Sequence, residues 1–474
     1  MRRIAWRMAI LAALAVIGFP GVSPAQQPAP VDFAKLALEA QGWLVDLLRI
    51  DTTNPPGNEL AAAKYIATVL ENEGIHSEVI ENSPGRAVVI ARLSAGAVPD
   101  PSRALLLMGH TDVVGVDRSK WTQDPFSGAT KDGYLWGRGT IDDKGPLVAN
   151  LATFITLKRL AVKLDRDVIF LAESDEEAGG SGMDFVVTQH WEKIAAGFAI
   201  NEGGRTIVRN GKVLYVGVQA TEKVSVNVAV IATGRSGHAS IPTKENAVVH
   251  LAAAIEKIGT WETPAKPNTI TRRFFEQLAN VEEPERAKWM RALDSSEREQ
   301  QAARRLSELD PAWSSMLRNS IAPTMLQAGI RVNVIPSEAR GMLNIRLLPG
   351  ELIGDLINDM NKLVNDPQVR IEVEPAKGQP APPSSLDTDL YRAIEHATQK
   401  VFPGAATVPM MSTWATDSLF LRLRNVECYG LVPMPLTEEE IARMHADDER
   451  IPIPSIEKAI ELVYASVEEF VKAK

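Results

Sequence analysis

Short apolar runs alternate with helical periodicity through the first 200 residues, which is the pattern of an α/β fold. Each of these runs is only four to eight residues long, the length of a buried strand, and polar or glycine-rich segments bound it. The helices have apolar residues at helical spacing, and Thr52 to Gly57 separates the first two. Strands are expected at 77–80, 87–93, 104–108, 167–172 and 197–200, and helices at 33–48, 59–73 and 145–160.

The pattern changes after residue 218. Val224, Val226, Val228 and Val230 alternate with small or polar residues, as in a strand with one buried face. The elements expected next are a helix at 246–258, strands at 328–334 and 341–347, a helix at 352–364 and a strand at 369–373. A small α+β domain at 219–377 is therefore predicted to interrupt a larger α/β domain made of 31–218 and 378–474. Residues 270–319 form a charged, helical insertion, and helices at 393–401, 418–424 and 455–470 and a strand at 429–433 resume the larger domain.

Three of the predicted strands end in metal-binding residue types. The run 104–108 is followed by His110 and Asp112, the run 167–172 by the acidic segment 173–177, and the run 197–200 by Glu202. In an open α/β sheet, reacting groups gather beyond the carboxyl ends of the strands. A single acidic cluster of this kind is also expected in a solvated loop. Three clusters at equivalent positions favour one metal site.

Two further segments carry metal-binding residue types. Asp142 and Asp143 lie in a glycine-rich loop before the helix at 145–160, where they could also form a turn and a helix N-cap. His445 precedes the final helix. By contrast, we interpret four other histidines as structural or surface groups, namely His76, His190, His250 and His396.

Length, net charge and cysteine count limit the domain number, the partners and the metal ligands that we expect. A length of 474 residues exceeds one typical core and favours two domains. The net charge of −9, without a basic stripe, argues against a nucleic-acid partner. Cys428 is the only cysteine, which excludes an intrachain disulfide and a thiolate zinc cluster. A bound metal would therefore need His, Asp and Glu ligands.

The amino terminus has the order of a secretory signal. Arg2, Arg3 and Arg7 precede an apolar segment from Met8 to Phe19, and small residues lead to Ala25. The apolar segment is too short for a stop-transfer helix. We expect residues 1–25 to be a signal peptide and the mature protein to be exported to the periplasm, without a stable membrane span.

Taken together, these motifs resemble the dizinc amidohydrolase and exopeptidase family of aminoacylase, carboxypeptidase G, carboxypeptidase S, acetylornithine deacetylase and succinyl-diaminopimelate desuccinylase. The resemblance covers the chain after the signal segment. Its motifs are Gly109 to Asp112, Gly137 to Gly145, Asp175 to Glu177, Asn201 to Gly203, Gly237 to Ser240, Asn333 to Pro336, Arg346 to Gly350, and His445.

The resemblance implies a zinc-exopeptidase-like catalytic domain with a mostly parallel central sheet. It also implies that 219–377 is a ferredoxin-like domain acting as a lid and in dimerisation. The insertion at 270–319 is expected to lengthen this lid, and in that respect the chain looks most like the carboxypeptidase S branch.

The resemblance also assigns roles at the metal site. His110 and Glu202 would bind one zinc ion, Glu177 and His445 the other, and Asp142 would bridge them. The family keeps a cis peptide bond after the bridging residue, here between Asp142 and Asp143.

Other residues are matched to supporting and catalytic roles. Asp112 resembles the partner that orients His110, and Glu176 resembles the general base. His238 would donate to the oxyanion, although a plain turn histidine is the alternative. Arg346 and Asn333 would bind the substrate, although Arg346 could be an ordinary solvated strand arginine.

The function implied is zinc-dependent hydrolysis of an amide bond next to a free carboxylate. Dipeptides, carboxyl-terminal peptide bonds and N-acyl amino acids all fit this description, and Co²⁺ or Mn²⁺ could replace zinc. A homodimer is expected. The alternatives are a non-catalytic exported binding protein that keeps the fold, and a periplasmic solute-binding protein, which would not need acids at three strand ends.

Overall fold

The computed structural model describes residues 31–96, 98–375 and 380–473. The predicted signal peptide at 1–25 lies outside these residues. Within the described ranges, the helices are too short or too polar to cross a membrane.

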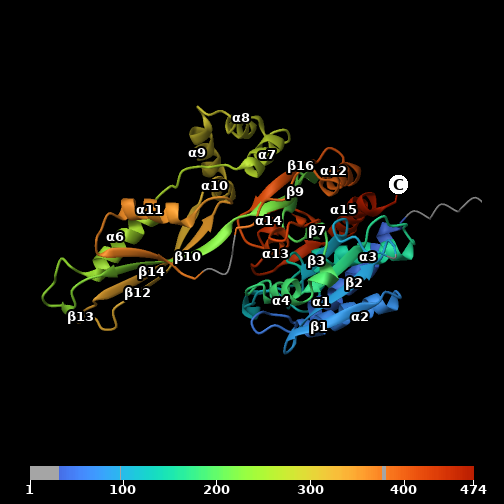
Figure 1. The fold of residues 1–474 in the computed structure, drawn as a ribbon, viewed down its shortest axis with the longest axis horizontal. Coiled ribbons are helices and arrows are strands. Elements are labelled where there is room, and N and C mark those ends of the chain that lie inside the picture. The colour runs from blue at the N-terminus through green and yellow to red at the C-terminus, as the bar shows by residue number, and fades with distance from the viewer. Residues whose placement is uncertain (1–30, 97, 376–379, 474) are drawn as a thin grey trace, which may run out of the picture. The chain divides into compact units, whose positions relative to one another are not determined.

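A ten-stranded mixed sheet organises the larger part of the chain (Figure 1). Its middle strands β6, β3, β7 and β17 run parallel to one another, whereas β2 pairs antiparallel with β1 and β6, and β9 pairs antiparallel with β8 and β17. The mostly parallel centre agrees with the predicted catalytic-domain fold. The strands, in spatial order, are β1 (Ser77–Ser83), β2 (Arg86–Leu93), β6 (Val168–Glu173), β3 (Leu105–His110), β7 (Phe198–Asn201), β17 (Glu427–Gly430), β9 (Lys212–Glu222), β8 (Arg205–Arg209) and β18 (Pro435–Leu436), with β16 (Ala406–Ser412) also paired to β9.

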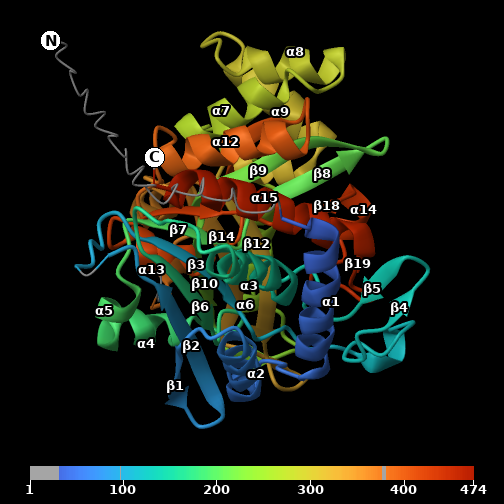
Figure 2. The same ribbon diagram turned by 90° about the vertical axis from the view of Figure 1, so that its right-hand side faces the viewer.

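Helices cover both faces of this sheet, which explains why its central strands are apolar throughout. On one face, Leu106 and Met108 of β3 pack with Met183 of α4 (Ser181–Gln189) and Leu421 of α13 (Ser418–Arg422). On the other face lie α1 (Phe33–Arg49), α3 (Lys144–Arg159) and α15 (Ile453–Val471), visible together in Figure 2. Two more helices, α2 (Glu59–Asn72) and α12 (Asp389–Val401), also belong to this part. The helices expected in this region are present within a few residues.

Two turns that contain glycine form hairpins. Asp132 and Gly133, with φ of 52° and 82°, connect β4 (Thr130–Lys131) and β5 (Tyr134–Trp136). Asn210 and Gly211, with φ of 53° and 73°, connect β8 and β9. Both pairs adopt the left-handed conformation that a two-residue hairpin turn requires.

A four-stranded antiparallel sheet with two helices forms the lid. Its spatial order is β12, β14, β10, β15, and the chain order is β10, α6, β12, β14, α11, β15, which is the ferredoxin-like arrangement expected. Val228, Leu343, Leu251 and Met360 are core residues between sheet and helices. The bounds are β10 (Val224–Thr233), α6 (Ala247–Gly259), β12 (Ser320–Ala328), β14 (Glu338–Leu347), α11 (Ile353–Val364) and β15 (Val369–Val373).

The expected strand at 328–334 is wrong in its position. β12 ends at Ala328, and Gly329 follows with a φ of 65°, a conformation that interrupts a strand. Ile330 and Val332, whose apolar character suggested a buried strand, are 94% and 102% exposed. Val334 and Ile335 form the short β13, which pairs with Gly237 and His238 of β11.

The insertion packs on the catalytic sheet, whereas we expected it to lengthen the lid. Its helices are α7 (Thr269–Leu278), α8 (Pro284–Ala292), α9 (Glu299–Leu309) and α10 (Pro311–Leu317). Phe274 and Phe275 of α7 share a buried cluster with Val408 and Met410 of β16. The insertion therefore docks on the catalytic sheet, where Figure 1 shows α7 beside β16 and β9. The buried aromatic residues of α7 require this apolar surface.

Lys223 marks the change from the catalytic sheet to the lid sheet. β9 ends at Glu222 and β10 begins at Val224. The Lys223 ammonium is buried and donates to the backbone carbonyls of Ser315 and Arg318 at 2.9 and 2.8 Å. It thereby ties the junction to the end of the insertion. The exact domain limits at 218 and 377 stay predictions.

Candidate metal centre

The predicted ligands come together because three parallel strands end at the same edge. β3 ends at His110, the segment after β6 carries Glu176 and Glu177, and Glu202 directly follows β7. β3 lies between β6 and β7 in the sheet. Ligand atoms of His110, Glu176 and Glu202 lie within 4.8 Å of one another, and so do those of His110, Asp142 and Glu177.

The carboxylate of Asp142 lies between two imidazole rings. Its Oδ1 is 2.9 Å from Nε2 of His110, and its Oδ2 is 3.0 Å from Nε2 of His445. Nε2 of His445 is also 3.1 Å from Oε1 of Glu177. Each oxygen of the Asp142 carboxylate thus faces a different histidine ring. The peptide bond between Asp142 and Asp143 is cis, as the resemblance implies.

A glycine turn directs Glu202 into this cluster. Gly203 and Gly204 have φ of 113° and 66° and reverse the chain between β7 and β8. A Cβ atom on Gly204 would lie 2.1 Å from the backbone oxygen of Gly217, so a larger residue does not fit. Glu202 is 7% exposed at the end of this turn.

The pKa shifts within the cluster reflect its high density of carboxylates. Burial alone would lower the pKa of His110, but Asp112 and Asp142 outweigh it and raise this pKa well above its usual value. Hydrogen bonds with Asp142 and Glu177 raise the pKa of His445 to about 10. Burial and neighbouring carboxylates raise the pKa of Glu202. Because so many carboxylates crowd together, bound cations would stabilise them all.

Asp112 connects His110 to the acidic segment that follows β6. Nδ1 of His110 is 3.4 Å from Oδ1 of Asp112 and 3.1 Å from its backbone oxygen. The Asp112 carboxylate also accepts hydrogen bonds from the backbone N–H groups of Glu176 and Glu177 at 3.2 and 3.1 Å. Asp112 therefore contacts the ring of His110 and holds the backbone of both glutamates.

Glu449 is a supporting residue that the sequence analysis did not identify. Its buried carboxylate pairs with Nη1 of Arg138 at 2.6 Å and accepts from the backbone N–H of Ile141 at 2.7 Å. It also accepts from Gly139 and, at 3.4 Å, from Asp142. Glu449 thus holds the loop that presents Asp142. In the sequence, the feature that could have pointed to Glu449 was its position four residues after His445.

Asn54 is a second supporting residue that was missed, because its segment was interpreted only as a helix breaker. Its side-chain amide donates to Asp112 at 2.7 Å and to Asp175 at 2.8 Å. Asp175 has a φ of 72° and also pairs with Arg86 at 2.9 Å. These contacts fix the turn that presents Glu176 and Glu177.

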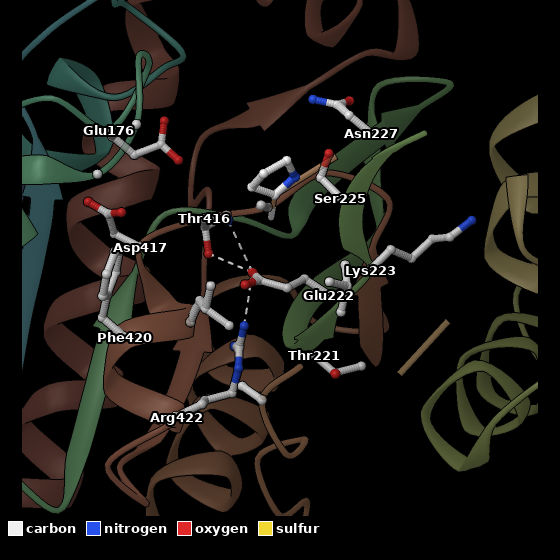
Figure 3. Close-up of a pocket in the computed structure, with 17 residues that line it drawn as sticks. Glu176, Thr221, Glu222, Lys223, Ser225, Asn227, Thr416, Asp417, Phe420 and Arg422 are labelled. Carbon is white, nitrogen blue, oxygen red and sulfur yellow. Dashed lines mark hydrogen bonds and ion pairs between the residues drawn. The ribbon is translucent and has the colours of Figure 1, made fainter. Parts of the chain in front are cut away.

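A cavity of about 460 Å³ opens beside Glu176 (Figure 3). Glu176 and Asp417 lie on one side of it, and Ser225 and Asn227 of β10 lie on the other. Burial raises the pKa of Glu176 well above its usual value; His110 opposes this shift, and neighbouring carboxylates such as Asp417 add to it. A carboxyl group with a raised pKa at the wall of a cavity is a candidate for proton exchange with a bound molecule.

The base of this cavity holds a buried ion pair. Glu222 lies 2.9 Å from Nη2 of Arg422 and accepts from the Thr416 hydroxyl at 2.8 Å (Figure 3). Both charged side chains are at most 5% exposed. Burial raises the pKa of Glu222, although Arg422 opposes this effect. The pair joins the end of β9 to α13 below the cavity.

Three predicted site residues are outside the cluster and lie on the lid. His238 is exposed, and its Nδ1 accepts from the backbone N–H of Ser240 at 3.1 Å. The backbone oxygen of Asn333 accepts from Ala239 at 3.1 Å, so Asn333 adjoins the His238 segment. Arg346 pairs in register with Ser225, and its Nε donates to Asn344 at 3.1 Å. Arg346 lies on the less buried face of β14, as predicted.

The side chains of the cluster offer imidazole nitrogens and carboxylate oxygens, but no thiolates, as possible metal ligands. Two imidazoles and several carboxylates suit zinc and similar divalent ions. An α/β sheet that carries such a cluster beside a cavity defines a metal-dependent hydrolase.

Residues 106–469 match the family described as Peptidase family M20/M25/M40, and the chain belongs to this family. It is therefore a metallopeptidase or amidohydrolase. The human N-fatty-acyl-amino acid synthase/hydrolase PM20D1 is 28% identical over 491 residues, covering 97% of this chain and 95% of that protein. The probable carboxypeptidase S-like 2 of Dictyostelium discoideum is 29% identical over 373 residues, covering 76% of this chain and 70% of that protein. The M20 family metallo-carboxypeptidase Sso-CP2 from Sulfolobus solfataricus has the same fold, with a TM-score of 0.69, 19% identity and coverage of 91% of this chain and 99% of that one.

Proposed function

We propose that this protein is a dizinc hydrolase that cleaves an amide bond adjacent to a free carboxylate, in an N-acyl amino acid or a short peptide. The observation that carries the proposal is the carboxylate of Asp142, which faces His110 and His445 with its two oxygens. The cavity beside Glu176 provides the space for a substrate.

Five residues would hold two zinc ions. His110 and Glu202 would bind one ion, Glu177 and His445 the other, and Asp142 would bridge them. When bound, the ions would supply Lewis acidity, which lowers the pKa of water and polarises a carbonyl oxygen. Co²⁺ and Mn²⁺ accept the same nitrogen and oxygen donors and are expected to substitute for zinc.

Glu176 acts as the general base in this proposal. It would take a proton from the attacking water and return it to the leaving nitrogen. Its backbone N–H is anchored on Asp112, while its side chain lies at the cavity wall. The raised pKa of the buried carboxyl supports the second half of this cycle, because a weak acid holds the proton until the nitrogen accepts it.

The lid would provide the remaining groups. Arg346, whose guanidinium is half-buried on β14, would bind the substrate carboxylate. His238 would donate a hydrogen bond to the developing oxyanion, and Asn333 beside it would contact the substrate. Bringing these groups in after the substrate binds would also exclude water.

A homodimer formed through the lid accounts for the exposed apolar residues there. β12 is an edge strand of the lid sheet, and its Met325 and Leu326 are 54% and 62% exposed. Val249 on α6 is 61% exposed. An edge strand with apolar side chains is suited to pairing with a second copy of the chain. In such a dimer, His238 of one chain would complete the active site of the other.

The relatives support the substrate class only in general terms. PM20D1 is named for N-fatty-acyl amino acids, whereas Sso-CP2 is named as a carboxypeptidase. Both kinds of substrate have an amide near a carboxylate. The deciding experiment is a hydrolysis screen of dipeptides and N-acyl amino acids with the zinc-loaded protein. We expect turnover of at least one class and its loss in Glu176→Ala. The absence of turnover in both classes would favour the rival interpretation, a non-catalytic binding protein.

A further inference from the structure

A second cavity, of about 390 Å³, lies between the insertion and the catalytic sheet. Phe274 and Leu278 of α7 and Trp313 and Met316 of α10 line it from the insertion. Met410 of β16 lines it from the sheet. The insertion therefore forms one wall of this cavity, and the catalytic sheet forms the other.

The lining of this cavity is apolar and adaptable. Tyr215 packs edge to face against Phe274 at a ring distance of 6.4 Å, and Trp313 packs on Phe275 at 5.8 Å. Met316 and Met410 contribute flexible thioether side chains, which adjust to chains of different length and shape. Such walls favour an aliphatic or aromatic group over a charged one.

The lining also contains five charged residues, which are Arg205, Arg209, Glu282, Asp310 and Glu438. Arg209 pairs with Glu282 at 3.0 Å and with Glu438 at 3.1 Å. The guanidinium of Arg205 lies 5.8 Å from the ring of Trp414. The carboxylate of Asp310 accepts from the backbone N–H of Ala312 at 2.7 Å. Among the described residues of the lining, Arg205 is the cation without an ion pair to a carboxylate, so an anionic substrate tail would contact it, and an N-succinyl substrate tests this alternative.

The position of the cavity relates it to the metal centre. Gly204 in its lining is two residues from Glu202, and Met444 is the residue before His445. Trp414 lines this cavity, whereas Ala415 and Thr416 line the cavity beside Glu176. The two cavities thus share one loop and adjoin segments that carry proposed ligands.

We infer that the second cavity binds the apolar acyl chain of an N-acyl amino acid substrate, while the amino-acid part occupies the cavity beside Glu176. This assignment rests on the proposed amide hydrolysis and names the substrate class. The insertion then acts as a specificity element, because its Leu278, Trp313 and Met316 set the length and shape of the acyl group that fits.

The first test is the dependence of kcat/KM on chain length. In a series from N-acetyl to N-dodecanoyl derivatives of one amino acid, kcat/KM should rise about 3-fold for each buried methylene and level off once the cavity is filled. Leu278→Trp and Ala312→Phe, which both add volume to the lining, should reduce the long-chain value at least about 10-fold and leave N-acetyl turnover within about 2-fold. Using two variants guards against a folding defect in either one. Leu309→Trp is the matched control, because Leu309 is 43% exposed on α9 and lies outside the lining.

The second test measures binding without turnover. An N-acyl amino acid with a terminal bromine on its acyl chain should quench tryptophan fluorescence of Glu176→Gln, because Trp313 and Trp414 line the cavity. Introducing Trp313→Phe should remove a large part of the quenching. Trp289→Phe, which replaces a tryptophan of the insertion outside the lining, should retain it.

The outcomes separate this inference from the proposed function. Three results would overturn the acyl-chain assignment and leave amide hydrolysis standing. They are hydrolysis that does not depend on acyl-chain length, an unchanged chain-length preference in Leu278→Trp and Ala312→Phe, and a preference for N-succinyl over N-butanoyl substrates. Quenching that depends on Trp313, in a protein that hydrolyses no amide, would support the cavity assignment and overturn the proposed function.

Discussion

Glu449 and Arg138 form an ion pair at 2.6 Å with side-chain exposures of 0% and 2%. The same carboxylate accepts the backbone N–H of Ile141, directly before the proposed bridging residue Asp142. Glu449 also follows His445 by four residues. One buried pair therefore connects the two segments that carry the proposed ligands Asp142 and His445.

Glu449→Gln should weaken both the fold and the metal site. The substitution leaves Arg138 as a buried charge without its partner, which typically costs about 3–5 kcal/mol of unfolding free energy. Loss of the support behind Asp142 should weaken zinc binding by about 10- to 100-fold. Denaturant unfolding and competition with a chelating dye measure the two effects. Glu439→Gln, at a side chain that is 81% exposed, should change neither, and an unaltered zinc affinity in Glu449→Gln would refute the positioning role.

Glu176 and Glu177 should have separable roles, although they are adjacent. Glu176→Ala should keep metal content near that of the parent and slow turnover by about 10²- to 10⁴-fold, as expected for loss of a general base. Glu177→Ala should lower the metal content itself, because its Oε1 lies against His445. Elemental analysis of both purified variants decides the matter. Equal loss of zinc from the two proteins would show that the base and the ligand are wrongly assigned.

The parent protein should bind two zinc ions per chain, because its proposed ligands are too many for one catalytic ion with an open position. Chelation should abolish activity, and added zinc should restore it. His445→Ala should lower the bound zinc toward one ion per chain. His396→Ala, whose side chain is 66% exposed and contacts Glu469, is the matched control. A parent that binds at most one ion after saturation would contradict the dinuclear site.

Asp417 should make the stability of the metal-free protein decrease as pH rises. Burial, partly offset by a hydrogen bond with Glu173, raises the pKa of Asp417 from 3.8 to about 6. Between these two values the folded protein binds more protons than the unfolded chain, so its unfolding free energy falls with increasing pH. The stabilising contribution is complete below about pH 4 and is lost as the pH rises through about 6.

Asp417→Asn tests this expectation because it removes the titrating group while keeping its size. Relative to the parent, the variant should gain unfolding free energy between pH 4 and pH 7, measured by denaturant titration of chelator-treated protein. Asp359→Asn, at an exposed position on α11, should show no such trend. A constant difference between Asp417→Asn and the parent over this range would contradict the raised pKa.

Chains that are inactive for different reasons should complement each other if His238 acts across a dimer. Heterodimers of His238→Ala with Glu176→Ala would contain one site in which both residues are intact, and they should regain part of the parent activity. A mixture of Glu176→Ala with Asp142→Ala should stay inactive, because each chain then lacks a residue of its own metal site. If verified His238→Ala/Glu176→Ala heterodimers show no recovery, His238 does not act in the partner's site.

Much of the fold and of the metal site was predictable because the signals are local. A strand is recognised from a few consecutive apolar residues, and the residue after it then lies at a known edge of the sheet. His110, the segment with Glu176 and Glu177, and Glu202 were found in this way. The two hairpin turns were also predictable, since Asp132-Gly133 and Asn210-Gly211 adopt left-handed backbone conformations that few other residue pairs tolerate.

Local signals failed where packing decides between alternatives. Ile330 and Val332 have the apolar character of a strand but are exposed, because Gly329 ends β12 before them. β16 was missed, although its residues are buried in pairing with β9, since Pro409 weakens its strand signal. The helices of the insertion were expected, but their amphipathic pattern does not specify which apolar surface they cover.

The sequence by itself determined most of the strands and helices of the catalytic sheet, the metal-binding residue types at three strand ends, and the resemblance to a class of metal-dependent hydrolases. Only the tertiary structure revealed Glu449 behind Asp142, Asn54 between Asp112 and Asp175, and the cavity that the insertion builds on the catalytic sheet. Glu449 and Ile141 are 308 residues apart in the chain. Their hydrogen bond depends on how the whole sheet closes around the site, and no short-range pattern of residues encodes such a contact.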